Sequence, residues 1–543
     1  MINLKNGLLA CLLILCFEIE AQKRRPNIVL IMSDDMGYSD IGAFGGEVKT
    51  PNLDRLAEKG LRFTQFYNAA RCCPTRASLM TGCYPHQAGI GHMTNPPSNA
   101  QGHNYGLPEY QGYLNRNTVT IAEVLKEAGY ATLMTGKWHL GYFGKDKWPL
   151  QRGFDKFYGI IAGASNFFNP VAPRGLTLGN ESVLPEGEEY YTTDAFTDYA
   201  IRFMEENKRE NSTKPFFLYL AYTAPHWPLH APQEDIEKYK GRYKAGWSSL
   251  RQERYARMKQ MGIMDPAWEL SPQDAREWNS LSEEKKVEMD LRRAIYSAMI
   301  DRMDQNIGRV VSSLETMGVL DNTVIIFLND NGACAEFSEL GSGPKEQLET
   351  KEGYVLSYGK AWANASNTPY REYKHWVHEG GISSPFIVHW PAGVAPALSG
   401  QVISNNYAFL PDIMATCLDL AEASYPSVYD GKNIVPTSGK SILPVLQGGN
   451  RPIHEEPIFW EHEGNRAVRL GKYKLVSKWE EGQQDNWELY DMEKDRTEMH
   501  DLAGVLPEIV EKLSDSYVEW AQKNNVLPWE DIIRIRKEIK NHN

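Results

Sequence analysis

The sequence feature that most restricts the fold is a set of short, continuous apolar runs, most of which end abruptly in polar residues. The runs lie at Asn27–Met32, Tyr130–Met134, Pro215–Ala221, Thr323–Leu328 and Pro385–Val388. Strands that are apolar along their whole length are typical of a mostly parallel sheet that is covered on both faces. We therefore expect a buried, largely parallel central sheet.

Amphipathic helices lie between these runs. Apolar residues from Leu291 to Leu314 recur at helical spacing directly before the Thr323–Leu328 run. Alternating strands and helices indicate a doubly wound α/β domain, in which ligands bind at the carboxyl ends of the strands. Those ends carry polar and ionisable side chains, which we expect to form one site: Asp34, Asp35, Lys137, His139, His226, Asp330 and Asn331.

The length of the chain and its changing pattern predict two domains. At 543 residues, the chain exceeds what one hydrophobic core usually serves. We expect a large α/β domain over residues 22–448 and a smaller α+β domain with an antiparallel sheet over residues 449–543. The strands and the closing helix of the smaller domain are expected at Arg466–Val476, Trp487–Tyr490 and Pro507–Gln522. Residues 235–286, rich in charge and tryptophan, are expected to form a helical insertion, which either walls the site or lies solvated outside it.

The first 21 residues have the pattern of a secretory signal peptide. A lysine precedes an apolar run from Leu8 to Phe17, and cleavage is expected after Ala21. The run is too short to span a bilayer, and no later stretch is apolar for long enough to do so. We expect an exported protein, periplasmic or secreted. The alternatives are a buried N-terminal segment and a lipoprotein anchored at Cys16, the second disfavoured by Leu15.

Charge and cysteine content exclude some classes of function. The formal net charge of −12 argues against binding to nucleic acid or an anionic membrane, because both need a basic surface. It leaves room for a small anionic substrate in a locally basic pocket. Without the signal peptide five cysteines remain, an odd and sparse set that does not form a disulfide framework. The adjacent pair Cys72–Cys73 therefore needs another explanation.

The pair begins the stretch CCPTRASLMTG. Pro74 suits the first turn of a helix and Gly82 suits its end. Cys72 then lies at a helix N-terminus, where backbone N–H groups favour negative charge, and Arg76 projects from the same face. A disulfide between neighbouring cysteines would be strained, and zinc-binding cysteines are usually two to four residues apart.

This stretch resembles the signature of the type I sulfatases, C-x-P-S/T-R-x-x-x-L/M-T-G. Further resemblances follow in order along the chain: DDMGYSDIG from Asp34, TPNLDRLAEKGLRFTQFYNA from Thr50, TGKWHLG from Thr135, PHWP from Pro225, NDNG from Asn329 and NTPYREYKHWVHEGGI from Asn367. The set is most similar to the bacterial arylsulfatase-like branch of the alkaline phosphatase superfamily. The resemblance implies that a dedicated maturation enzyme oxidises Cys72 to formylglycine before folding, and that Cys73 occupies a variable position.

The predicted site offers oxygen ligands for a metal ion. Carboxylate and amide oxygens suit a hard cation such as calcium or magnesium better than zinc. The resemblance implies a single calcium ion, and its ligands would be Asp34, Asp35, Asp330, Asn331 and the modified Cys72.

The resemblance also implies a mechanism, which stands as a hypothesis. Water adds to the aldehyde at residue 72, and one hydroxyl of the resulting diol attacks sulfur with help from calcium and Arg76. His226 protonates the departing alcohol, while His139 helps to deprotonate the second hydroxyl, which expels sulfate. Lys137 and Lys374 supply fixed positive charge. Five other histidines are expected to be structural: His86, His92, His375, His378 and His389.

The leaving group is less constrained by the sequence. Trp460–Arg469 has the composition of a polar loop, in which His462, Asn465 and Arg466 either hydrogen-bond sugar hydroxyls or form a solvated turn. An exported sulfatase of this branch is expected to remove sulfate from the end of a carbohydrate. The alternatives are a phosphate or phosphonate monoester hydrolase and a non-catalytic glycan-binding relative. The chain also departs from the family pattern in carrying Cys83 after Thr-Gly, where a basic residue is common, and Ser383 where an arginine is common.

Overall fold

The computed structural model describes residues 25–94, 104–483 and 486–542, so the predicted signal peptide lies outside the described residues. Its centre is an 11-stranded sheet with the order β10-β2-β9-β8-β1-β7-β3-β4-β5-β6, in which β11 also pairs with β2. The strands are β1 (Asn27–Ser33), β2 (Leu61–Tyr67), β3 (Ala131–Lys137), β4 (Lys156–Ile160), β5 (Leu176–Leu178), β6 (Glu181–Val183), β7 (Phe216–Ala221), β8 (Thr323–Asn329), β9 (Ser383–His389), β10 (Val402–Ile403) and β11 (Ala408–Phe409).

The middle of the sheet is parallel, which confirms the predicted fold class. Strands β8, β1, β7, β3 and β4 all run in one direction, and Ile31 of β1 lies opposite Leu220 of β7 and Phe327 of β8. Strand β9 runs antiparallel to both β8 and β2. The carboxyl ends of β1, β3, β7 and β8 therefore meet at one edge, where the sequence places its polar residues.

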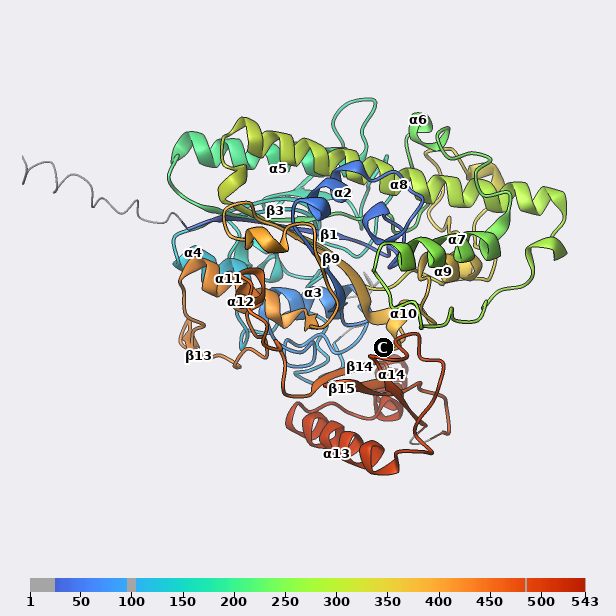
Figure 1. The fold of residues 1–543 in the computed structure, drawn as a ribbon. Coiled ribbons are helices and arrows are strands. Elements are labelled where there is room, and N and C mark those ends of the chain that lie inside the picture. The colour runs from blue at the N-terminus through green and yellow to red at the C-terminus, as the bar shows by residue number, and fades with distance from the viewer. Residues whose placement is uncertain (1–24, 95–103, 484–485, 543) are drawn as a thin grey trace, which may run out of the picture.

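Helices cover both faces of the sheet (Figure 1). On one face, a buried cluster joins the sheet to α2 (Pro51–Glu58), α5 (Thr192–Glu210), α7 (Gly246–Gln260), α8 (Glu283–Thr316) and α9 (Gly359–Ser366). On the other face, a second cluster joins it to α3 (Cys72–Thr81), α4 (Ile121–Glu127), α11 (Pro411–Ala421) and α12 (Leu443–Leu446). Successive side chains of β1 alternate between the clusters: Val29 and Ile31 face the first, Ile28 and Leu30 the second.

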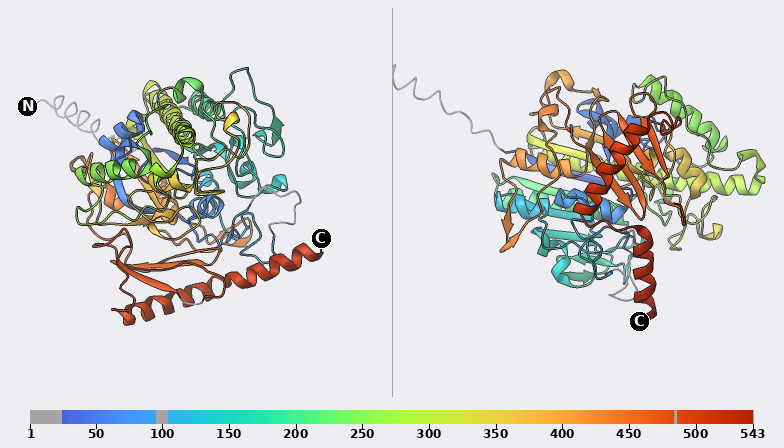
Figure 2. Two further views of the ribbon diagram at one scale, coloured as in Figure 1. Left: turned by 90° about the vertical axis from the view of Figure 1, so that its right-hand side faces the viewer. Right: turned by 90° about the horizontal axis from the view of Figure 1, so that it is seen from below.

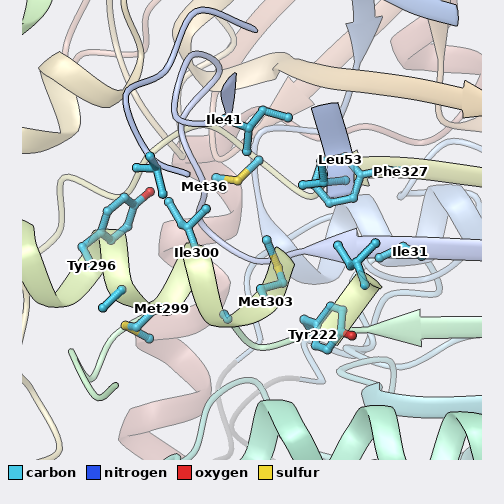
Figure 3. Packing of buried hydrophobic residues seen from close by; sticks show 14 of the residues in the cluster. Ile31, Met36, Ile41, Leu53, Tyr222, Tyr296, Met299, Ile300, Met303 and Phe327 are labelled. Carbon is cyan, nitrogen blue, oxygen red and sulfur yellow. The ribbon is translucent and has the colours of Figure 1, made fainter. Parts of the chain in front are cut away.

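Helix α8 contains the predicted apolar repeat and is 34 residues long. Its Met299, Ile300 and Met303 are fully buried in the same cluster as Ile31 and Phe327 of the sheet (Figure 3). Each such side chain contributes about 1.5–3 kcal/mol of burial free energy. Packing of this kind fixes the strands whose ends carry the site.

The charged, tryptophan-rich segment contains α6 (Gln233–Ile236), α7 and a short 3₁₀ turn at Trp278–Ser280. It packs into the large domain. The Trp247 ring lies 4.8 Å from that of Trp278 and 5.4 Å from that of Trp362 in α9, and all three are buried. Arg254 of α7 pairs with the buried Asp40 at 2.8 Å.

The C-terminal region forms an antiparallel sheet in the order β14-β15-β16-β17. Its elements are β14 (Ile458–His462), β15 (Asn465–Leu470), β16 (Tyr473–Ser477), β17 (Trp487–Asp491), α13 (Pro507–Lys523) and α14 (Trp529–His542). The prediction of strands within Arg466–Val476 is confirmed by β15 and β16, whereas the prediction of a polar loop from Trp460 is wrong, because these residues form the β14–β15 hairpin with Trp460 opposite Ala467. In Figure 2, α13 lies along the outer side of this sheet, and α14 continues from it beyond the end of the sheet. In the described part of the chain, no helix is long and apolar enough to cross a membrane.

A buried ionic cluster joins the two regions. Glu379 begins α10 (Glu379–Ile382) and accepts from Lys474 of β16 at 2.9 Å and from Arg496 at 2.8 Å. Arg496 also donates to Ser383 at 3.2 Å. The guanidinium at this place thus comes from the C-terminal region, whereas the sequence resemblance leads one to expect an arginine at position 383 itself.

Candidate active site

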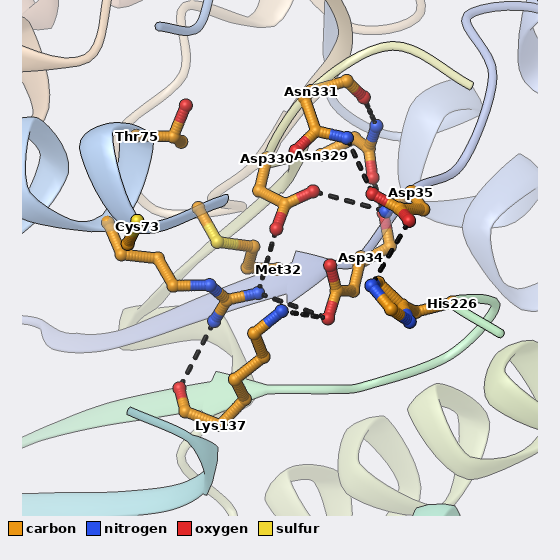
Figure 4. A network of polar contacts seen from close by, with 12 residues as sticks. Met32, Asp34, Asp35, Cys73, Thr75, Lys137, His226, Asn329, Asp330 and Asn331 are labelled. Carbon is orange, nitrogen blue, oxygen red and sulfur yellow. Dashed lines mark hydrogen bonds and ion pairs between the residues drawn. The ribbon is translucent and has the colours of Figure 1, made fainter. Parts of the chain in front are cut away.

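Two neighbouring strands supply four buried oxygen-bearing side chains. Asp34 and Asp35 follow β1, and Asp330 and Asn331 follow β8, all at most 1% exposed. Asn331 donates through Nδ2 to Asp35 Oδ1 at 2.7 Å, and the Asp35 backbone N–H donates to Asp330 Oδ1 at 3.1 Å (Figure 4). The parallel pairing of β1 with β8 brings the predicted ligand set together.

Two buried cations balance part of this negative charge. Lys137, at the end of β3, donates to Asp34 Oδ2 at 2.6 Å. Arg76 of α3 donates through Nη2 to Asp330 Oδ2 at 3.0 Å and through Nη1 to the Lys137 carbonyl at 3.1 Å. All of these side chains are fully buried, so the ion pairs are weakly screened.

Lys374 and His226 approach the carboxylate of Asp35. The Lys374 Nζ atom lies 2.9 Å from Asp35 Oδ2, and the His226 Nε2 atom lies 3.3 Å from the same oxygen. Burial by itself raises the pKa of Asp35, but His226 and Lys374 outweigh it and lower the pKa to about 2. This carboxylate is therefore ionised throughout the neutral range.

Cys72 lies within this group. Its sulfur and single ligand atoms of Asp34, Asp35 and His226 all lie within 4.8 Å of one another. As predicted, Cys72 begins α3. The expectation that the helix N-terminus favours negative charge there is outweighed, because burial raises the pKa of the thiol to about 12. An unmodified cysteine here is thus a protonated, weak nucleophile.

Gly82 ends α3 as predicted. It adopts a left-handed φ of 69°, and a Cβ atom added there would lie 2.7 Å from side-chain atoms of Met414 and Thr437. Only glycine fits this end of the helix, which carries Cys72 at its first position.

The hydrogen bond made by His139 shows which of its ring nitrogens carries the hydrogen. Its Nε2 atom lies 2.6 Å from the Thr94 carbonyl oxygen, which can only accept, so Nε2 carries the hydrogen. The Nδ1 atom is buried and has no hydrogen-bond partner among the described residues. Burial, and next the charge of Lys137, lower the pKa of His139 well below its usual value. His139 is therefore neutral with a free lone pair, as a proton acceptor must be.

His226 has the opposite arrangement. Its Nδ1 atom donates to the Trp227 carbonyl oxygen at 2.6 Å, and its Nε2 atom faces Asp35. Burial lowers the pKa of His226 to about 4, although Asp35 acts against this shift. At neutral pH the ring is therefore neutral, with its hydrogen on Nδ1 and the lone pair of Nε2 facing Asp35, so a general-acid role requires a proton to be placed on Nε2 first.

The residues present fit a hard cation. Asp34 Oδ1 and Asn331 Oδ1 are buried and have no hydrogen-bond partner among the described residues. Burial, and next the charge of Asp330, raise the pKa of Asp34 well above its usual value. Unpartnered buried oxygens and crowded carboxylates are what a divalent cation would satisfy.

The predicted substrate-binding residues separate into two places. His462 and Asn465 are buried next to His375: the two imidazole rings lie 5.3 Å apart, and Asn465 Nδ2 lies 3.3 Å from His375 Nε2. Arg466, the next residue of β15, lies over Trp487 at 4.5 Å and Tyr517 at 5.8 Å. The structure therefore brings His462 and Asn465 towards the site, behind His375, but not Arg466.

The sequence interpretation missed Glu336, Arg71 and His375. Glu336 accepts from Arg71 at 2.7 Å and from the Trp227 indole at 3.0 Å, and it lies 3.6 Å from Lys374. The sequence feature that could have indicated Glu336 is its position six residues beyond Asp330, in the loop that follows β8. The backbone N–H of His375 donates to Ala70, and its side chain is 28% exposed, so the structural role expected for it is incomplete.

Comparison with known proteins agrees with this geometry. A family model described as Sulfatase matches residues 26–423, and a model described as N-sulphoglucosamine sulphohydrolase, C-terminal, matches residues 371–523. The chain is 35% identical to an uncharacterized sulfatase of Schizosaccharomyces pombe, covering 94% of this chain and 96% of that protein. It is 36% identical to an arylsulfatase of Klebsiella aerogenes, covering 78% of this chain and 90% of that one.

Other similar proteins are named for a carbohydrate or are bound to one. An N-acetylgalactosamine-6-sulfatase of Rattus norvegicus is 30% identical, covering 84% of this chain and 74% of that protein. Among solved structures, Ps i-CgsB in complex with k-i-k-neocarrahexaose has a TM-score of 0.69 at 26% identity, covering 95% of this chain and 97% of that one. The matched signature around Cys72, the buried charged site and these relatives lead to one assignment. The chain belongs to the sulfatase family of the alkaline phosphatase superfamily, and it is a sulfuric ester hydrolase.

Proposed function

We propose that the protein is an exported, exo-acting carbohydrate sulfatase that uses a formylglycine derived from Cys72 and one calcium ion. The observation that carries the proposal is the convergence of Cys72 with buried carboxylates and cations at the ends of four strands. The names of the rat relative and of the oligosaccharide complex support a carbohydrate. Because Cys72 is fully buried, the end of a glycan reaches it more easily than the middle.

Maturation of Cys72 supplies the nucleophile. With a pKa raised to about 12, the thiol itself would be almost entirely protonated at neutral pH. Formylglycine supplies instead a hydrated aldehyde, with one hydroxyl to attack sulfur and a second whose deprotonation releases sulfate. A formylglycine-generating enzyme is therefore the partner required before folding.

The charged residues hold and polarise the sulfate group. Asp34, Asp35, Asp330, Asn331 and residue 72 would hold calcium, a Lewis acid that draws electron density from sulfate oxygens. Lys137, Lys374 and Arg76 add fixed cations in a buried environment, where they stabilise developing negative charge without reorganising.

The two histidines divide the proton transfers. Neutral His139, with Nδ1 free, accepts a proton from residue 72. His226, with Nδ1 held by the Trp227 carbonyl, donates from Nε2 to the oxygen of the leaving alcohol. A sugar alkoxide is a poor leaving group, so this donation accounts for a large part of the rate.

The sugar is bound outside the sulfate position. His375 is partly exposed and is supported from behind by His462 and Asn465, so it contacts the hydroxyl groups nearest the sulfate. Arg466 lines a cavity of about 380 Å³ together with Trp479 and Trp529 and contacts a more distant unit of the glycan.

The decisive experiment is the mass of the protease-released peptide that contains Cys72, from protein made in its native host. The mass of the aldehyde or its hydrate is expected. An unmodified cysteine in protein that still hydrolyses sulfate esters would refute the proposed nucleophile. The same cysteine in inactive protein, with activity gained when the chain is co-expressed with a formylglycine-generating enzyme, would support it.

A further inference from the structure

An exposed group of aromatic rings lies directly beside His226. Trp227 contacts Phe337 with ring centroids 5.2 Å apart and Tyr354 with centroids 5.8 Å apart, both edge to face. Phe337 is 52% exposed and Tyr354 is 39% exposed. In the described part of the chain, these two are the aromatic members of the set of exposed large hydrophobic side chains, and both contact the same indole. We call Trp227, Phe337 and Tyr354 the aromatic patch.

The patch is held in a fixed arrangement. Glu336 accepts from the Trp227 indole at 3.0 Å, which sets the orientation of the ring. The Leu229 N–H donates to the Leu356 carbonyl at 2.9 Å, which ties the segment carrying Tyr354 to the segment carrying Trp227. Exposed rings that are already ordered lose little entropy when a ligand binds, so the arrangement favours binding.

Charged groups surround the rings on the side of the catalytic residues. The Arg174 guanidinium lies 5.1 Å from the centre of the Tyr354 ring, and its charge acts on His139. Glu336 pairs with Arg71, which precedes Cys72 in the chain. The patch thus has an apolar face and a rim of hydrogen-bonding groups.

A pyranose ring matches this combination. One face of a sugar presents C–H groups that pack on aromatic rings, while its hydroxyls reach donors and acceptors at the edge. An apolar partner would leave the charged rim without ligands, and a densely charged one would gain nothing from exposed Phe337.

We propose that the aromatic patch is the leaving-group subsite, in which the sugar ring that carries the sulfate stacks while His226 protonates its oxygen. Phe337 and Tyr354 are then specificity-determining residues, and Glu336 is a positioning residue that orients Trp227. This inference rests on the proposed carbohydrate sulfatase function.

The test compares two double variants of the matured, calcium-loaded enzyme. Phe337→Leu with Tyr354→Leu keeps apolar bulk but removes the rings, whereas Phe337→Tyr with Tyr354→Phe keeps them. The substrate is the sugar that the wild-type enzyme hydrolyses fastest among hexose and N-acetylhexosamine 4- and 6-sulfates. The leucine pair is expected to raise KM roughly five- to tenfold with kcat within about twofold, because stacking is retained in the transition state. The aromatic pair is expected to keep the wild-type KM.

Two controls separate loss of stacking from damage to the fold. Inhibition by inorganic sulfate, which occupies only the sulfate position, is expected to be unchanged in the leucine pair. Val428→Ala, at a residue 56% exposed in β12 (Val428–Tyr429), is expected to leave KM unchanged.

An unchanged KM in the leucine pair, or a weaker inhibition by sulfate that parallels the KM, would overturn the inference. So would a KM rise seen only with 4-nitrophenyl sulfate. Wild-type enzyme that hydrolyses 4-nitrophenyl sulfate but no sulfated sugar would instead refute the proposed function on which the inference rests.

Discussion

At the scale of single residues, the hydrogen bond that each site histidine makes decides which of its two ring nitrogens is left free. His139 and His226 are both buried imidazoles, and their chemical difference comes from which nitrogen a carbonyl oxygen occupies. The carbonyl of Thr94 leaves Nδ1 of His139 free, whereas the carbonyl of Trp227 leaves Nε2 of His226 facing Asp35. The two rings therefore leave different nitrogens free, and in the proposed mechanism His139 accepts a proton at Nδ1 while His226 donates one from Nε2.

Replacing His226 by alanine is expected to lower kcat for a sugar sulfate by about a hundred- to ten-thousand-fold, because the alkoxide then leaves without a proton. The loss is expected to be much smaller for 4-nitrophenyl sulfate, since nitrophenolate needs no proton to leave. Steady-state rates on both substrates measure the difference. The control is His389→Ala, at a buried histidine that ends β9 at the edge of the sheet away from the site. It is expected to leave both rates unchanged. Equal losses on the two substrates would exclude the role of His226 as the acid.

At the scale of elements, the site exists because four strands end together. Strands β1 and β8 bring Asp34, Asp35, Asp330 and Asn331 to one edge, and β3 adds Lys137. Helix α3 contributes Cys72 and Arg76 from the face of the sheet that it covers. Removing Arg76, Lys137 or Lys374 from this edge would leave the buried carboxylate that it pairs with without that partner.

Chelation of divalent metal is expected to abolish turnover and to lower the melting temperature, since an ion present at a hundred times its Kd stabilises the folded state by about 2.7 kcal/mol. Calcium is expected to restore both better than magnesium, because the ligand set is all oxygen and rich in carboxylates. Ion binding requires ionised carboxylates, and the pKa of Asp34 is raised, so affinity for calcium should fall as the pH is lowered. Calorimetric scans with and without each metal provide the measurement. An unchanged melting temperature in chelator would contradict the proposed metal site.

At the scale of the whole molecule, a buried ionic cluster fixes the C-terminal region against the large domain. Burial by itself raises the pKa of Glu379, but Lys474 and Arg496 outweigh it and lower the pKa from 4.5 to about 2. A depressed carboxyl pKa contributes stability that is fully present above 4.5 and is lost as the pH falls towards 2. The contact between the C-terminal region and the large domain should therefore become less stable at acidic pH.

Substituting Glu379 by glutamine is expected to lower the free energy of unfolding by about 3–5 kcal/mol at pH 7, because buried Arg496 loses the carboxylate that it pairs with and Lys474 retains only Glu498 of its two carboxylate partners. The difference from the wild type should shrink between pH 4.5 and pH 2, where the wild-type carboxyl also loses its charge. Urea unfolding at several pH values measures this. Glu508→Gln, on the exposed side of α13, serves as the matched control and should change stability little. A penalty for Glu379→Gln that did not vary with pH would show that its charge is not the cause.

The sequence by itself determined what depends on neighbouring residues in the chain. Uninterrupted apolar runs specified the buried strands, because a strand covered on both faces must be apolar throughout. The stretch from Cys72 to Gly82 specified a helix with a cysteine at its start, and the polar residues at strand ends indicated which side chains would meet at the candidate site.

Only the tertiary structure decided what depends on contacts between distant segments. Nothing local marks Glu336 as the partner of Arg71 and Trp227, which lie 265 and 109 residues away. The same holds for Arg496, which approaches Ser383 and supplies a guanidinium where the sequence pattern had seemed to lack one. Trp460–Arg469 is polar enough to suggest a loop, but cross-strand pairing makes it a hairpin. Strand pairing, burial and the orientation of a ring depend on which distant segments come into contact. A sequence pattern shows only the properties of each segment by itself.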